Sequence, residues 1–181
     1  MITARWIDCD GASLEHLKLS ETGSGIHIES VIIARREGES FALSYRISCR
    51  PDWSVVSVDA RIIGSELSVS LRSDGAGNWT TGTRTPLSAL AGAIDADLSA
   101  TPFTNSLPIR RLGLARGEAA VIRAAYVSVP DLTVSLDEQR YTRIGDLSWR
   151  YEAVDGSFAR EIEVDAFGLV THYPGLFRRI G

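Results

Sequence analysis

The stretch Phe41-Ala42-Leu43-Ser44-Tyr45-Arg46-Ile47 places a bulky apolar or aromatic side chain at every second position. Side chains of a β-strand point alternately to the two faces of a sheet, so this period of two predicts a strand with one buried face. The same alternation recurs in four further segments, at residues 67–71, 121–129, 147–151 and 158–166. The sequence therefore predicts a protein built mainly of half-buried strands.

Short turn-forming pairs separate these segments at the spacing of β-hairpins. The pairs are Glu37-Gly38, Gly64-Ser65, Arg116-Gly117 and Asp155-Gly156, and residues 74–78 form a longer loop with two glycines. Helical patterns are confined to residues 13–20 and 86–91, each long enough for one or two turns. We therefore expect one all-β domain over residues 1–181, with about ten or more antiparallel strands and at most one or two short helices.

A sheet of that many strands has to protect its two edges, and rolling up is the usual solution. A rolled sheet of this size encloses more space than its own side chains easily fill. We therefore expect a half-barrel around an apolar cavity, and we expect the function to reside in that cavity.

Residues 95–114, DADLSATPFTNSLPIRRLGL, contain two prolines that bracket Phe103, Thr104 and Asn105. Proline fixes its own φ and disfavours the helical region for the preceding residue, so Thr101 and Leu107 are expected to be extended. The segment between them is then a rigid loop. Two interpretations stay open: a binding surface with polar tips, or a structural corner whose side chains cap their own backbone.

Three arginines share strand parity with apolar residues, namely Arg110, Arg123 and Arg160. This parity predicts that they point to the apolar side of the sheet. A buried guanidinium needs a carboxylate, a carbonyl or an anionic ligand, unless it lies at a wet rim with its stem packed. For any one of these arginines, an ion pair inside the protein or a position at the rim is a simpler explanation than contact with a bound ligand. Trp79, which follows the glycine loop, is the best candidate for an aromatic side chain at the rim.

The acidic residues offer a weaker case for chemistry. Asp95 and Asp97 lie on one face of a strand, where paired carboxylates could act as acid and base. Ion pairs with Arg110 or Arg111 are the preferred interpretation, because no nucleophile or second motif accompanies the two acids. The three histidines are scattered and lack zinc-ligand spacing, so neither a metal site nor a cofactor is expected.

Composition excludes some classes of partner. The formal net charge is −4 and the pI is about 5.4, which disfavours binding to nucleic acid. The two cysteines match neither a disulfide framework nor a metal motif, so free thiols are expected. The N-terminal stretch has no apolar signal-peptide core and no run approaches a membrane span, which predicts a cytoplasmic protein without a transmembrane segment.

Three long stretches carry a resemblance to a known family: IDADLSATPFTNSLPIRRLGL (94–114), AAYVSVPDLTVSLDEQRY (124–141) and VDAFGLVTHYPGLFRR (164–179). Together with Trp6, Asp52-Trp53, Asp74-Gly75 and Trp79, they make the chain similar to the bacterial "Putative glycolipid-binding" family from about Trp6 to Arg179. The resemblance implies a spiral β-roll, distantly like the periplasmic carriers of lipoproteins, and it implies no catalytic residue. The most distinctive matching positions are Asp97, Thr101, Pro102, Phe103, Thr104, Asn105, Leu107, Pro108 and Arg110.

The function expected from these observations is non-enzymatic binding of a lipid or glycolipid. The acyl part would fill the interior of the roll, and the head group would lie near the 101–105 loop and the inward arginines. The expected ligand-binding residues are Asp97, Thr101, Phe103, Thr104, Asn105, Arg110, Arg123, Arg160 and Trp79. One alternative is an enzyme that acts on a hydrophobic or sugar-like molecule with Asp95, Asp97 or Asp165. Another is an interaction module whose exposed sheet edge pairs with a partner or with a second copy in a homodimer.

Overall fold

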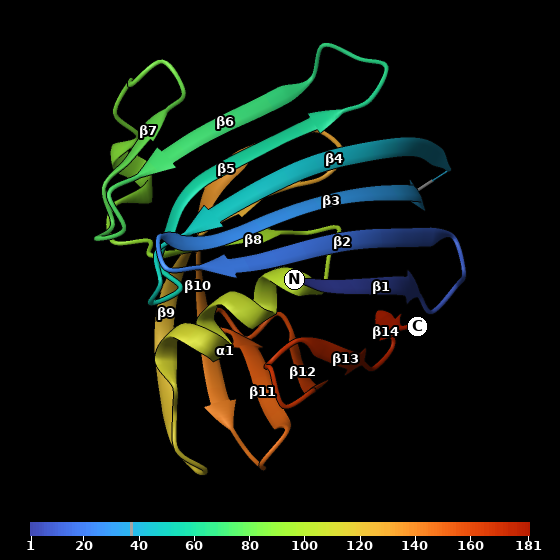
Figure 1. Ribbon diagram of the computed structural model, residues 1–181, viewed down its shortest axis with the longest axis vertical. Coiled ribbons are helices and arrows are strands. Elements are labelled where there is room, and N and C mark those ends of the chain that lie inside the picture. The colour runs from blue at the N-terminus through green and yellow to red at the C-terminus, as the bar shows by residue number, and fades with distance from the viewer. Residues whose placement is uncertain (37) are drawn as a thin grey trace.

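The computed structural model describes residues 1–36 and 38–181, and fourteen strands of this part of the chain form one continuous sheet (Figure 1). The strands are β1 (Ile2–Asp8), β2 (Ser13–Thr22), β3 (Gly25–Arg36), β4 (Glu39–Cys49), β5 (Val55–Ile62), β6 (Ser68–Ser73), β7 (Trp79–Thr81), β8 (Asp95–Leu98), β9 (Ala119–Val127), β10 (Val134–Arg143), β11 (Ser148–Ala153), β12 (Ala159–Val164), β13 (Val170–Tyr173) and β14 (Phe177–Arg179). Two short 3₁₀ turns, η1 (Ser88–Leu90) and η2 (Phe103–Asn105), and one helix, α1 (Ser106–Leu112), complete the fold.

The order of strands across the sheet is β7-β6-β5-β4-β3-β2-β1-β14-β13-β12-β11-β10-β9-β8. Every neighbouring pair is antiparallel except β8 and β9, which run parallel. The first and last strands lie side by side in the middle of the sheet, where Trp6 is opposite Arg179. The predicted all-β fold is confirmed, and the sheet is mixed because of this one parallel pair.

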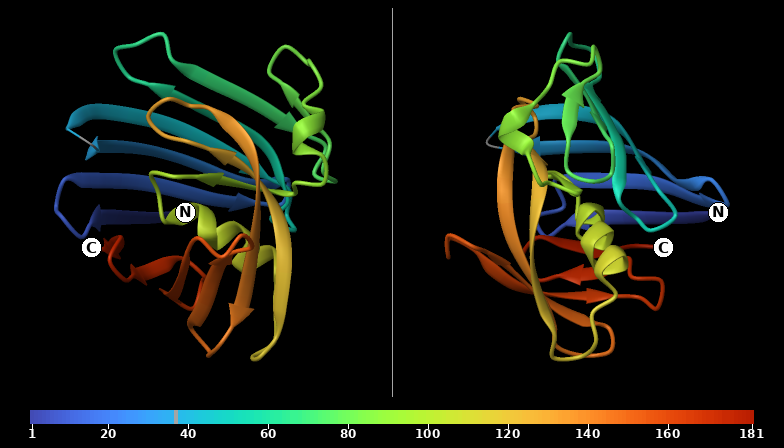
Figure 2. Two further views of the ribbon diagram at one scale, coloured as in Figure 1. Left: turned by 180° about the vertical axis from the view of Figure 1, so that it is seen from behind. Right: turned by 90° about the vertical axis from the view of Figure 1, so that its left-hand side faces the viewer.

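The sheet curls around on itself without closing into a barrel (Figure 2). Its curvature brings the segment that precedes β8 back to the start of β5, where the Val55 N–H donates to the Ile94 carbonyl at 3.2 Å. The rolled architecture predicted from the sequence is therefore present. No helix in the described ranges is long and apolar enough to cross a membrane.

The segment expected to be a rigid extended loop is helical. Residues 103–105 form η2, and α1 follows at once and ends before Gly113, which has a left-handed φ of 55°. Pro108 lies in the first turn of α1, where a missing backbone N–H leaves no hydrogen bond unmade. Leu107 is part of the helix, so the prediction of an extended Leu107 is wrong.

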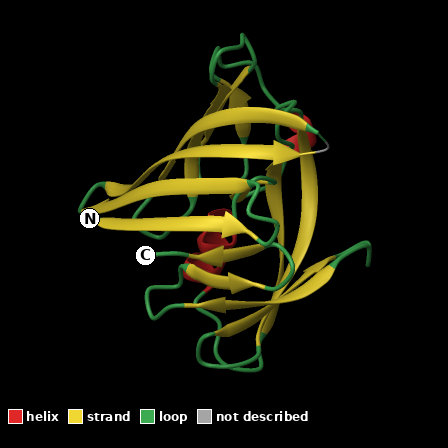
Figure 3. Ribbon diagram, turned by 90° about the vertical axis from the view of Figure 1, so that its right-hand side faces the viewer, coloured by secondary structure: helices red, strands yellow, loops and turns green. Residues whose placement is uncertain are grey.

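Helix α1 lies inside the rolled sheet, between the strands β1 to β5 on one side and β9 to β13 on the other (Figure 3). Phe103 and Leu107 are fully buried in a core built largely from β1 to β5, β8 and the end of β9. Ile109 instead packs into a second core on β9 to β13, with Tyr141 and Ile162. The helical segment thus contributes buried side chains to both cores inside the rolled sheet.

Two local expectations are wrong. Residues 13–20 belong to strand β2, because Glu15, Leu17 and Leu19 alternate as buried side chains. The run 121–129 does not keep one parity, since Val121 is 51% exposed and Ile122 is buried. Residues 88–90 form the short helical turn expected within 86–91. Turns occur at 64–65, 116–117 and 155–156 as predicted, and Glu37 of the remaining pair lies outside the described residues.

Candidate functional site

A cavity of about 370 Å³ opens on the inner side of the sheet, next to the start of η2. We refer to it as the Asp97 cavity. Its walls come from the strands β8, β9, β10, β11, β13 and β14, from η2 and from the loops beside them. Aromatic side chains form much of the lining, and three carboxylates join them. The aromatic residues are Tyr126, Tyr151, Phe158, Tyr173 and Phe177, and the acidic residues are Asp97, Asp137 and Asp155.

Strand register brings these residues together from distant parts of the chain. Asp97 on β8 is paired with Tyr126 on β9, which is in turn opposite Ser135 on β10. On β10 the period of two places Asp137, Gln139 and Tyr141 on one face. The parallel pairing of β8 with β9 therefore places the Asp97 carboxyl beside the polar residues of β10.

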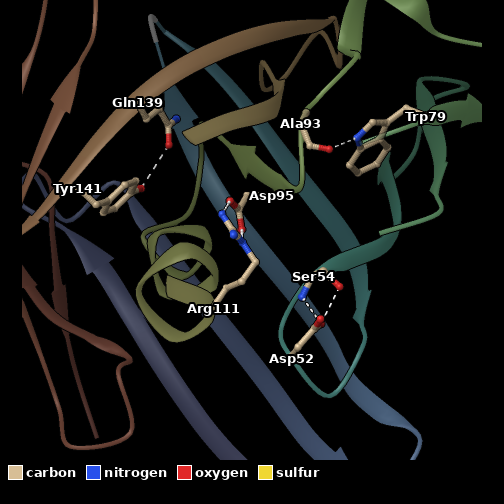
Figure 4. Close-up of polar contacts among 8 residues, drawn as sticks. All are labelled: Asp52, Ser54, Trp79, Ala93, Asp95, Arg111, Gln139 and Tyr141. Carbon is tan, nitrogen blue, oxygen red and sulfur yellow. Dashed lines mark hydrogen bonds and ion pairs between the residues drawn. The ribbon is translucent and has the colours of Figure 1, made fainter. Parts of the chain in front are cut away.

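One carboxamide connects two of the cavity carboxylates. The Nε2 atom of Gln139 donates to Asp97 at 2.8 Å and to Asp137 at 2.9 Å. The Tyr141 hydroxyl lies 3.3 Å from the side-chain carbonyl oxygen of Gln139 (Figure 4). Its shorter contact, at 2.9 Å, is with the side-chain oxygen of Asn105, to which it donates. Because carboxylates accept hydrogen bonds and do not donate them, the two acids favour the orientation in which the amide nitrogen of Gln139 faces them.

Among the described residues the Asp97 carboxyl has no basic partner, so the expected ion pair with Arg110 or Arg111 is wrong for this acid. Burial raises its pKa above the usual range for aspartate, and the nearby Asp137 carboxylate adds to the rise. Hydrogen bonds from Thr104 Oγ1, at 2.7 Å, and from Gln139 act in the opposite direction and lower this pKa. The cavity therefore contains a carboxyl that takes up a proton more readily than an exposed aspartate does.

Two tyrosines present unused hydroxyls to the cavity. Tyr173 is 5% exposed and Tyr151 is 9% exposed, and among the described residues neither hydroxyl has a hydrogen-bond partner. Edge-to-face contacts fix both rings, since Phe158 lies 5.8 Å from Tyr151 and 6.4 Å from Tyr173 between ring centroids. The two rings are largely buried, whereas the hydroxyl oxygens are not among the fully buried atoms, so these hydroxyls face the cavity as positions where a ligand could bind.

A second buried carboxyl lies behind the cavity wall. Glu15 is 2% exposed and accepts hydrogen bonds from Ser30 at 2.7 Å, Tyr45 at 2.6 Å and Thr101 at 2.6 Å. Burial raises the pKa of Glu15 to about 7, although these three hydrogen bonds lower it. Thr101 also lines the Asp97 cavity, so one side chain connects the two carboxyl sites.

A smaller cavity of about 270 Å³ adjoins the first. Leu176 and Phe177 line both cavities, and Phe41, Ala34 and Ala100 add apolar surface to the smaller one. Polar residues complete the lining of this smaller cavity, among them Asp8, Cys9, Asp10, Ser13, Arg35 and Arg36. Leu176 and Phe177 are therefore the part of the lining that the two cavities share.

Some of the predicted ligand-binding residues line the Asp97 cavity, and the others lie outside its lining. Asp97, Thr101 and Asn105 line the cavity. Thr104 lies behind it and acts through its hydrogen bond to Asp97, whereas Phe103 is fully buried in the core.

Trp79 does not lie at a rim. It is 2% exposed, and its indole N–H donates to the Ala93 carbonyl at 2.7 Å (Figure 4). The hydrogen bond explains how a tryptophan next to a glycine loop becomes a core residue.

The three arginines do not converge on the cavity. Arg123 is exposed on the outer side of β9 and pairs with Glu138 at 3.0 Å, so its predicted inward orientation is wrong. The parity argument fails because both faces of β9 are covered near Ala124 and Ala125. Arg160 lies outside the cavity lining, where its guanidinium carbon is 4.9 Å from the centroid of Phe158.

Arg110 belongs to a separate cluster. Its guanidinium lies 4.9 Å from the Trp53 ring and 4.5 Å from the Phe167 ring, and 3.6 Å from a Glu21 carboxylate oxygen. The faces of aromatic rings attract cations, so this arginine is stabilised by protein groups.

The turn before β5 holds Trp53 in this cluster. Asp52 accepts hydrogen bonds from the Ser54 backbone at 3.0 Å and from its hydroxyl at 2.6 Å (Figure 4), and Trp53 between them has a left-handed φ of 70°.

The other two candidate acids are engaged in ion pairs. Asp95 is fully buried and receives two hydrogen bonds from Arg111, at 3.0 and 2.6 Å (Figure 4), as the preferred interpretation of this acid predicted. Asp165 pairs with Arg179 and accepts backbone hydrogen bonds from its own turn. Of the three acids considered for catalysis, Asp97 is the one that faces the cavity.

Most residues that line the Asp97 cavity are not among those expected from the sequence. Tyr126, Tyr151, Tyr173, Asp137 and Gln139 were not proposed as site residues, yet they build the cavity or hold its carboxylates. The signal available for two of them was the alternation Asp137-Gln139-Tyr141 within 134–143, which places polar residues on one face of a strand.

Comparison with known proteins agrees with this fold. The model of a family described as "Putative glycolipid-binding" matches residues 3–179. The crystal structure of a DUF1089 family protein from Pseudomonas aeruginosa superimposes with a TM-score of 0.83 at 37% sequence identity, over 93% of this chain and 92% of that one. No curated protein matches the chain. The family match over nearly the whole sequence shows that the chain belongs to the "Putative glycolipid-binding" family.

Proposed function

We propose that the protein binds a lipid or glycolipid without transforming it, and that the Asp97 cavity receives the polar head group. The observation that carries this proposal is the combination of aromatic rings with unused hydroxyl and carboxylate oxygens in one cavity. The C–H faces of a sugar ring pack on aromatic side chains, and sugar hydroxyls need donors and acceptors around them. A volume of about 370 Å³ is also within the usual range for small-molecule sites, about 300–1,000 Å³.

The acyl part is placed differently from the expectation based on sequence. Phe103 and Leu107 occupy the core between the halves of the sheet, so an acyl chain there would have to displace α1. The wall formed by Leu176 and Phe177 instead leads from the Asp97 cavity to the neighbouring one. We therefore place the acyl chain along this shared wall, with the head group against Asp97, Thr101 and Asn105.

The alternatives have less support. Asp95 and Asp165 are neutralised by ion pairs, which leaves an enzyme only Asp97 among the proposed acids. An interaction module would use a sheet edge, and the two edge strands β7 and β8 are three and four residues long. Edges this short offer few backbone groups to a partner strand.

Isothermal titration with octyl β-D-glucoside, below the concentration at which it forms micelles, tests the proposal. Ala153 lines the cavity, so Ala153→Trp fills part of it and should abolish binding. Ala119→Trp is the matched control, because Ala119 is exposed on β9 and outside the lining. Circular dichroism verifies that both variants fold. Equal heats for the wild type and Ala153→Trp, or no binding by the wild type, would contradict the proposal.

A further inference from the structure

The charge of the Asp97 cavity restricts what it can hold. Its described lining includes the carboxylates of Asp97, Asp137 and Asp155 and contains no lysine, arginine or histidine. A phosphate, sulfate or carboxylate group would lie among these acidic side chains and would have no basic partner in the lining. The part of the cavity at Asp97 and Asp137 is therefore unsuited to an anionic head group, whereas Arg36 donates to Ser99 and Arg160 contacts Phe158 elsewhere along the lining.

The two inner carboxylates retain free acceptor positions. A carboxylate offers about four lone-pair positions. Asp97 accepts one hydrogen bond from Thr104 and one from Gln139, and Asp137 accepts one from Gln139. The group that connects the two acids is a neutral amide, so among the described residues no cation balances this pair.

The aromatic wall also suits a positive charge. The faces of Tyr and Phe rings attract ammonium groups. The Phe158 ring already contacts a cation of the protein, since the guanidinium carbon of Arg160 is 4.9 Å from its centroid, whereas Tyr151 and Tyr173 have no such contact among the described residues. The unused hydroxyls of Tyr151 and Tyr173 are additional acceptors on the same wall, and both side chains are at least nine-tenths buried.

We propose that the cavity contains a subsite for a protonated amine, formed by Asp97 and Asp137 and flanked by Tyr151, Tyr173 and Phe158. The ligand class is a lipid whose head group carries an amino substituent, such as an amino sugar. An ammonium group has three N–H donors, which match the free oxygens of the two carboxylates and a tyrosine hydroxyl. This inference rests on the proposed function, because it specifies the head group of the same cavity.

Titration with a matched pair of ligands tests the inference. Octyl β-D-glucoside and its 2-amino-2-deoxy analogue differ by one group, and the titrations are carried out near neutral pH, because acid would favour the protonated form of Asp97, whose pKa is raised. We expect the amino compound to bind about tenfold more tightly or better, with the difference reduced at high salt. Equal affinities, or tighter binding of the neutral compound, would overturn the inference and leave the proposed function intact. Binding of neither compound would overturn both.

Two variants test whether Asp137 causes the difference in affinity between the amino and the neutral ligand. Asp137→Asn removes one of the two carboxylates, so it should lower the ratio of amino to neutral affinity severalfold. Glu161→Gln removes the same charge from an exposed position on β12 outside the lining, and it should leave the ratio unchanged. An unchanged ratio in Asp137→Asn, or an equal fall in both variants, would show that general surface charge and not this subsite discriminates between the ligands.

Discussion

The hydroxyl of Thr101 donates a 2.6 Å hydrogen bond to the buried carboxyl of Glu15, and Thr101 is also part of the wall of the Asp97 cavity. The contact joins residues from β2 and from the turn before η2, which lie 86 positions apart. Because Glu15 has no basic partner among the described residues, its ionisation affects the stability of the fold next to the proposed site.

The pH dependence of stability should reveal Glu15. Its pKa is about 7 in the folded protein and near 4.5 when exposed, so the folded state binds the proton more tightly. The stabilisation is fully present below about pH 4.5 and is lost as the pH rises through about 7. The shift corresponds to roughly 3 kcal/mol of unfolding free energy. Urea denaturation across this window should therefore show stability falling with pH.

Glu15→Gln should flatten this pH profile, because the amide does not titrate. Asp97 contributes in the same direction through its raised pKa, so part of the slope will remain. Glu29→Gln, at an exposed position on β3, serves as the control and should keep the wild-type slope. A Glu15→Gln profile as steep as that of the wild type would contradict the assignment.

Two tyrosine substitutions should differ in their effect on stability. Tyr141→Phe removes the donor to Asn105 and the contact with Gln139, which should lower the unfolding free energy by about 1–2 kcal/mol. Tyr173→Phe removes a hydroxyl without a protein partner in the described structure, so stability should stay within about 0.5 kcal/mol of the wild type. Chemical denaturation measures both values. A larger loss in Tyr173→Phe than in Tyr141→Phe would disprove the assigned roles.

The buried ion pair of Asp95 with Arg111 should be sensitive to loss of one partner. Asp95→Asn leaves the Arg111 guanidinium without its carboxylate, and breaking a buried pair in this way costs about 3–5 kcal/mol. The exposed pair Arg46–Glu29 is the comparison, and Glu29→Gln should remain close to the wild type. Thermal unfolding of both variants tests this, and similar melting temperatures for the two would contradict it.

Helix α1 should be held by its packing between the two cores. Leu107→Ala removes a fully buried side chain and should cost about 2–5 kcal/mol. Leu112→Ala, at the half-buried end of the same helix, should cost clearly less. Hydrogen exchange of the α1 amides provides a local measurement, and equal protection in the two variants would argue against the packing role.

The strands were the predictable part of the fold. Alternation in 41–47 identifies the buried face of β4 because Phe41, Leu43, Tyr45 and Ile47 all turn inward. Alternation specifies faces and not partners, so the pairing of β1 with β14 and the parallel pairing of β8 with β9 were beyond it. Helix α1 was missed because a seven-residue helix with an internal proline has little intrinsic signal and depends on tertiary packing.

Only the cavity residues that lie within the stretch 95–114 were predictable from the sequence. Asp97, Thr101 and Asn105 come from that stretch and line the cavity. Tyr126 and Tyr173 come from strands whose neighbours the sequence does not specify, so nothing in the pattern placed them beside Asp97. Arg123 was misplaced because period-two reasoning assumes one solvent face, whereas β9 is covered on both sides at Ala124 and Ala125.

The most direct test of the account is a crystal structure of the protein with octyl β-D-glucoside bound. The account predicts the sugar ring against Tyr151 and Phe158, with its hydroxyls hydrogen-bonded to the Asp97 and Asp137 carboxylates and the alkyl chain along Leu176 and Phe177. A ligand bound at another surface, or an alkyl chain inserted between α1 and the core with the sugar outside the Asp97 cavity, would contradict it.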